Sequence, residues 1–110
     1  MTFTTQDLDN LLSVLGLGPQ NALTAEQIAT RLGYPTGGNQ VKTRALITFA
    51  IESEYLIKSS TANPSGYWIS DNKQEMSEYI ESLRNRADHI SERAENLRST
   101  WNTQNPDDTI

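Results

Sequence analysis

The stretch LTAEQIATRLGY, residues 23–34, decides the fold. Thr24 and Gln27 stand three positions apart at its start, which predicts a capping box in which each side chain satisfies a backbone amide. Gly33 predicts a left-handed residue just after the last helical turn. The apolar residues between these ends recur at helical spacing and predict one buried stripe, formed by Ile28, Ala29 and Leu32. The stretch therefore predicts a short amphipathic helix.

The segment that follows predicts a turn and a further helix. Pro35, Gly37 and Gly38 lie in YPTGG, residues 34–38, and suit a tight turn. Asn39 is the candidate N-cap of a helix over about residues 40–53. The predicted inward face is Val41, Ala45, Leu46, Phe49 and Ala50, and the predicted outward residues are Gln40, Lys42, Thr43, Arg44 and Thr48.

Further elements are predicted upstream and downstream of these two helices. Upstream, four leucines at helical spacing predict an amphipathic helix that begins at an N-cap, Thr5, and ends at Gly16: Leu8, Leu11, Leu12 and Leu15. Downstream, YLIKSS and YWIS are short runs rich in aromatic and branched residues, with TANPSG between them. This pattern predicts a β-hairpin, in which Tyr67 and Trp68 serve as packing residues.

A long helix is predicted that Asn72 and Glu75 open and that runs to about Trp101. In MSEYIESLRNRADHISERAENLRSTW, residues 76–101, apolar residues are spaced alternately by four and three positions, the period of a coiled coil. Residues 102–110 have nothing to pack and are predicted to be a disordered tail. The predicted dimer interface is Ile80, Leu83, Ala87, Ile90, Ala94, Leu97 and Trp101.

The charges beside this apolar seam leave its partner open. Every charged residue that flanks the seam is an arginine, whereas the acids lie on the back of the helix. The helix can pair antiparallel with its twin, pack on the amino-terminal helix of its own or a partner chain, or await an acidic partner. Folding back on its own domain is disfavoured because some 30 residues span about 45 Å. We expect a homodimer.

Composition narrows the classes of protein. The chain has 110 residues, no cysteine and a net charge of −5, which argues against a protein that coats nucleic acid without specificity. Residues 24–58 nevertheless carry four cations against three carboxylates. The opening MTFTTQDLDN lacks the features of a secretory signal, and no apolar run is long enough to span a bilayer. We expect a soluble cytoplasmic protein without membrane contact.

The order of helix, helix, turn, helix, hairpin and long helix resembles a winged helix-turn-helix domain. The resemblance is carried by LTAEQIATRLG, by NQVKTRALITFAIESEYLI as the recognition helix running into a strand, and by KSSTANPSGYWI as the wing. The long helix is similar to those of small phage and prophage proteins. The resemblance implies a mainly α (α+β) fold, with a winged-helix domain over residues 1–70, a dimerisation helix over 71–101 and a tail over 102–110.

This resemblance implies a DNA-binding site on the third helix and the wing. Residues near the amino end of that helix would meet base edges, with Arg44 able to form two bonds to a guanine, while Lys42 would bind a phosphate. The implied site is Gln40, Lys42, Thr43, Arg44, Lys58 and Asn63. The expected function is that of a small dimeric transcriptional regulator that binds double-stranded DNA. The alternative is a protein-interaction module, such as an acidic phage-type inhibitor or adaptor.

Catalysis is not expected. The single histidine, His89, is predicted on a solvent-facing position of the long helix, and no Cys/His cluster suits zinc. Neither pair of closely spaced glycines follows a strand in the pattern of a phosphate-binding loop. We therefore expect no enzyme activity, no metal site and no cofactor.

Overall fold

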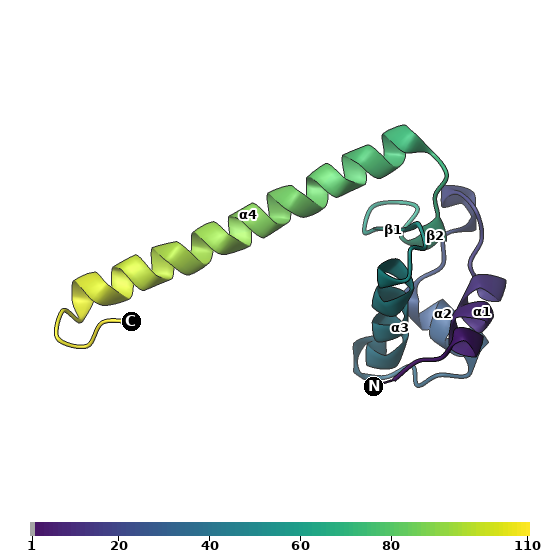
Figure 1. The fold of residues 1–110 in the computed structure, drawn as a ribbon, viewed down its shortest axis with the longest axis horizontal. Helices are drawn as coiled ribbons and strands as arrows, with labels where there is room; N and C mark the ends of the chain where they lie inside the picture. Colours follow the sequence, from purple (N-terminus) through teal and green to yellow (C-terminus); the bar gives the residue numbers. More distant parts are fainter. Residues whose placement is uncertain (1) are drawn as a thin grey trace. The chain divides into compact units, whose positions relative to one another are not determined.

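The computed structural model describes residues 2–110 and consists of two compact units, one that ends at Met76 and one from Ser77 to Ile110. The fold is mainly helical, with one two-stranded antiparallel sheet and a long carboxy-terminal helix (Figure 1), which confirms the predicted α+β class at this level. Within the described residues, no helix is both long and apolar enough to cross a membrane.

The first two helices begin at capping boxes. Helix α1, Thr5–Val14, is capped by Thr4, whose side chain accepts from the amide of Asp7; the prediction of Thr5 as N-cap is wrong by one residue because the carboxylate of Asp7 returns to the Thr4 amide. Helix α2, Ala25–Leu32, has the predicted box of Thr24 and Gln27, and the predicted left-handed Gly33 ends it with φ 74°. Both ends of α2 are therefore confirmed.

The core of the first unit lies where the three short helices meet the hairpin. Leu11, Ile28 and Leu46, one from each of α1, α2 and α3 (Val41–Glu52), are 0% exposed. Burial of such a side chain contributes about 1.5–3 kcal/mol. The remaining buried members are Leu8, Leu15, Leu23, Ile47, Ala50 and Ile57.

The hairpin consists of β1, Ile57–Ser60, and β2, Gly66–Ile69, with Lys58 opposite Trp68 and Ser59 opposite Tyr67. The free edge of β2 bonds to the segment between α1 and α2, an arrangement that the sequence did not predict. The amide of Tyr67 donates to the Leu23 carbonyl at 2.7 Å, and the amide of Ile69 donates to the Gly16 carbonyl at 2.9 Å. Strand β2 is therefore held on both sides.

Helix α3, Val41–Glu52, differs from its prediction in its start and in its buried face. Asn39 and Gln40 both have positive φ, 61° and 53°, and no side chain caps the helix, so the prediction of Asn39 as N-cap is wrong. Val41 is 63% exposed, although it was predicted to face inward. The buried positions are Thr43, Leu46, Ile47 and Ala50, a stripe with the spacing i, i+3, i+4, i+7 that includes a residue predicted to face outward.

Helix α4, Lys73–Gln104, begins as predicted and ends later. The side chain of Asn72 accepts from the amide of Glu75 at 2.8 Å, while the Glu75 carboxylate accepts from the indole of Trp68 at 2.6 Å. Residues 102–104, assigned by the sequence to the tail, form the last turn of α4 because the helical pattern of backbone bonds continues past Trp101.

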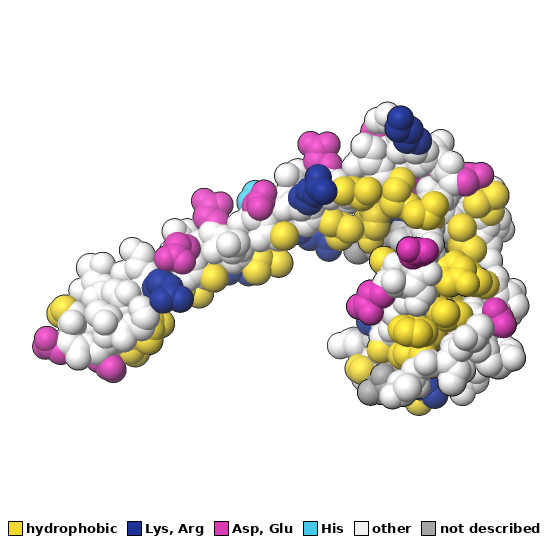
Figure 2. Space-filling view, viewed as in Figure 1, with side chains coloured by type: hydrophobic (Ala, Val, Ile, Leu, Met, Phe, Trp, Pro, Cys, Tyr) yellow, Lys and Arg dark blue, Asp and Glu magenta, His cyan; other side chains and the backbone are white. Residues whose placement is uncertain are grey.

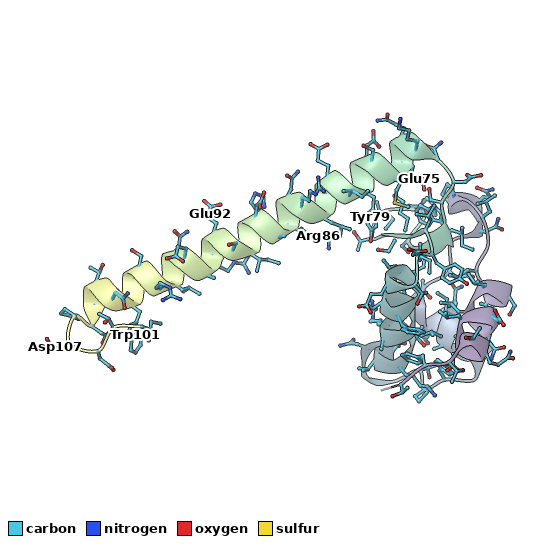
Figure 3. The ribbon with its side chains drawn as sticks, viewed as in Figure 1. Glu75, Tyr79, Arg86, Glu92, Trp101 and Asp107 are labelled. Carbon is cyan, nitrogen blue, oxygen red and sulfur yellow. The ribbon has the colours of Figure 1, made fainter. Side chains whose placement is uncertain are left out.

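Residues 105–110 also differ from the predicted disordered tail, because they return along the end of α4 (Figure 3). The indole of Trp101 donates to the Asp108 carbonyl at 2.6 Å. Asn102 and Ile110 exchange two hydrogen bonds, at 2.9 and 3.2 Å. The sequence did not predict this return because the side chains of Trp101 and Asn102 bond to main-chain groups. The spacing of apolar residues does not reveal such bonds.

Candidate nucleic-acid interface

Arg44 joins α3 to the hairpin. Its Nε donates to the Asn39 carbonyl at 2.7 Å, and one of its terminal nitrogens donates to the hydroxyl of Tyr67 in β2 at 2.9 Å. The left-handed backbone at Asn39 turns this carbonyl toward the first turn of α3, where the guanidinium can reach it. The side chain is exposed but oriented, and its second terminal nitrogen retains two donors for a ligand.

Lys42 lies at the other side of the same helix start. Its Nζ is 4.1 Å from the centroid of the Tyr34 ring, which follows α2. Burial, followed by the nearby negative charge of Asp7 and a hydrogen bond to it, raises the pKa of Tyr34 above its ordinary value of 10.0. The ring is therefore neutral at physiological pH and serves as a support for the ammonium group.

The structure does not bring Lys58 to the face that Arg44 occupies. Successive side chains of a strand point to opposite faces of a sheet. The face with Tyr67 also carries Ile57 and packs on the core, whereas Lys58 lies on the other face, with its Nζ 4.6 Å from the centroid of the Trp68 ring. Asn63 lies apart from both, in the exposed loop between the strands.

The two remaining residues of the predicted DNA-binding site, Thr43 and Gln40, are less exposed to solvent than Arg44. Thr43 is 0% exposed, so the prediction that it faces outward and meets a base is wrong; the buried stripe of α3 passes through it. Its hydroxyl has no hydrogen-bond partner among the described residues. Gln40 is half-buried, and its side-chain amide donates to the Thr36 carbonyl within the turn before α3. The turn was predicted over residues 34–38, but this bond was not, because it forms where Asn39 and Gln40 have left-handed backbone.

The charges along α3 are segregated. Within the described residues, neither Lys42 nor Arg44 forms an ion pair with a carboxylate, and the acids Glu52 and Glu54 lie at the opposite end of the helix. The positive end of the α3 dipole lies beside the two cations, and no side chain caps the helix there. The amino end of α3 is thus a small cationic surface built around the exposed Val41.

A second candidate surface is the apolar face of α4. Within the described chain, no residue of α4 is buried, and its large apolar side chains are 41–66% exposed: Ile80, Leu83, Ile90, Leu97 and Trp101. Figure 2 shows hydrophobic side chains along one edge of α4 and acidic ones along the other. Of the internal ion pairs that the spacing allows, Arg98 and Glu95 approach to 3.8 Å on the exposed surface.

The two tyrosines that contact Arg44 and Lys42 were not predicted from the sequence. Tyr67 is 23 positions from Arg44, and its position facing α3 follows from the strand register. Tyr34 follows the capping glycine of α2, a place where the pattern predicts only a turn. No family model, no curated protein and no solved structure shows a significant match to this chain.

Proposed function

We propose that the chain is a winged-helix protein that binds duplex DNA through the amino-terminal half of α3 and acts, as a homodimer, in transcriptional regulation. The observation that carries the proposal is the amino end of α3, where Lys42 and Arg44 are free of carboxylate partners and a dipole of the same sign adds to them. In this proposal, the hairpin beside α3 is the wing.

Arg44 is the residue proposed to contact a base. Its bonds to Asn39 and Tyr67 use two of the five guanidinium donors, so the remaining terminal nitrogen can approach guanine acceptors without loss of either support. Lys42 and the uncapped amides of α3 would bind phosphates. Because the side chain is held in advance, little of its rotational entropy is lost on binding.

Two cations give one protomer few phosphate contacts, and affinity for DNA comes largely from such contacts. Two copies on one duplex would double them. The apolar face of α4 is the proposed means of dimerisation, since its large apolar side chains are 41–66% exposed and no residue of the helix is buried.

The test is fluorescence anisotropy with a random duplex over a salt series. We expect binding that weakens as salt rises, with a slope of log K against log salt of about −0.9 for each phosphate contacted. Arg44→Ala should reduce affinity, while Arg31→Ala, an equal change of charge at an exposed site on α2, should have a smaller effect. An Arg44→Ala protein that binds as well as the parent would remove Arg44 from the site.

Tyr67→Phe separates charge from position. It removes the hydroxyl that holds Arg44 and leaves the guanidinium charge in place. We expect weaker binding with an unchanged salt slope, because the number of phosphate contacts stays the same. A loss of slope would instead mean that Arg44 contacts a phosphate.

One observation favours a second candidate, a protein-interaction module. Val41 is 63% exposed at the centre of the same surface, and the chain carries a net charge of −5. A protein partner would bury Val41, whereas a phosphate would not. Absence of duplex binding at low salt would favour this function over the first.

A further inference from the structure

The side chains on the apolar face of α4 follow a pattern of size as well as a regular spacing. The face runs for 26 residues from Met76 to Trp101, and monomeric proteins rarely expose a continuous apolar surface of such extent. Its residues also differ systematically in size. The two smallest, Ala87 and Ala94, alternate with the large residues Leu83, Ile90 and Leu97.

When two copies of this face are placed antiparallel, small residues lie opposite large ones. With Met76 of one chain opposite Trp101 of the other, Ala87 lies opposite Ile90 and Leu83 lies opposite Ala94. The outer layers combine Ile80 with Leu97. The central layers then have nearly equal volume, which allows two helices to keep one separation along them.

A parallel pair lacks this match. Each residue would face its own copy, so layers of two alanines would alternate with layers of two leucines or two isoleucines. Ile90 would moreover take the position at which parallel dimers favour leucine, and the alanines would take those that favour branched residues. Gaps beside the alanine layers would weaken the pair.

We propose that α4 pairs with a second copy in antiparallel orientation, in the register that sets Met76 opposite Trp101. This deepens the homodimer of the proposed function and rests on it. The flanking charges decide little between the two orientations. The antiparallel pair sets Arg84 and Arg98 opposite serines and Arg86 opposite Arg93, while the parallel pair sets Arg93 opposite Arg98. Such exposed contacts are screened by water and salt, so packing decides.

The register has a consequence for the DNA. The two Met76 residues, where the first units end, would be separated along the pair by 25 residues, or about 38 Å. An antiparallel pair has a two-fold axis, so the partner implied is a duplex with two-fold related half-sites.

Disulfide formation tests the register without DNA. The chain has no cysteine, so Leu83→Cys and Ala94→Cys each introduce one thiol on an exposed part of α4, outside the core of the first unit. In the proposed pair, position 83 lies beside position 94 of the other chain, within disulfide reach. Two copies of position 83 would lie about 16 Å apart along the axis, as would two copies of position 94, which is too far for a bond.

We expect little covalent dimer from either variant alone. An oxidised mixture should convert about half of its chains, because random exchange of protomers makes one pair in two mixed. Cross-linking of each variant with itself would overturn the proposal in favour of a parallel pair. Absence of cross-links in all three samples, with helix content retained by circular dichroism, would overturn pairing through this face. Neither result bears on duplex binding, which the anisotropy experiment measures separately.

Discussion

Replacing Thr43 by valine is expected to stabilise the first unit. The side chain is 0% exposed, and its hydroxyl has no partner among the described residues. A helical threonine often donates to the carbonyl four residues earlier, but here that carbonyl, of Asn39, accepts from Arg44. A buried unpaired polar group costs about 1–3 kcal/mol, and valine has nearly the same shape without it. Valine and threonine also have similar helix propensities, so a change in propensity should offset little of this gain in stability.

The assay is urea unfolding followed by the fluorescence of the buried Trp68, with Trp101→Phe as the background to remove the second indole. We expect the free energy of unfolding to rise by about 1–2 kcal/mol. The control is Thr48→Val on the exposed side of α3, where the hydroxyl donates to the Arg44 carbonyl; it should change stability by less than about 0.5 kcal/mol. An unchanged or lower stability in Thr43→Val would refute the inferred orientation of α3. A loss of duplex affinity in this variant, without loss of stability, would restore Thr43 to the DNA site.

Three further predictions concern other parts of the fold. Gly66→Ala should cost about 3 kcal/mol in thermal unfolding, because φ is +124° and the new Cβ would lie 2.4 Å from the Leu23 carbonyl oxygen; Gly37→Ala, with open space and φ −88°, is the matched control and should be nearly neutral. The raised pKa of Tyr34 means that folding favours the neutral phenol, so its stabilisation is present below about pH 10 and is lost as the pH rises through the raised value. In an NMR titration, Asp7→Asn should lower this pKa only in part, since burial is the larger cause. Arg86→Gln should tighten self-association by a few tenths of a kcal/mol in sedimentation equilibrium if Arg86 faces Arg93, whereas no change is expected if it faces Ser91, as in a parallel pair.

Several features that depend on residues close in the chain were predicted from the sequence. The box of Thr24 and Gln27, the left-handed Gly33 and the hairpin all follow from neighbours in the chain, and all are confirmed. The orientation of α3 was mistaken because threonine was counted as an outward residue, while its methyl group allows it to complete a buried stripe beside Leu46 and Ile47.

The candidate site was harder to predict because its geometry depends on distant residues. The resemblance to a winged helix-turn-helix domain pointed to Arg44 and Lys42, but the hydroxyl and the ring that hold them lie elsewhere in the chain. Lys58 was grouped with them because it is a cation in the hairpin, and only the register of the strands assigns it to the opposite face. Positive φ at Asn39 and Gln40, which neither residue type requires, also could not be foreseen.

The double attachment of β2 has a consequence for how the first unit acquires its structure. A two-stranded hairpin is marginally stable by itself in water. Here its second strand completes its bonding with the segment that carries Gly16 and Leu23, more than forty positions earlier in the chain. Hairpin and helices should therefore fold in one cooperative transition, more slowly than a bundle built from local contacts. The amide hydrogens of Tyr67 and Ile69 should then be among the last to exchange with solvent.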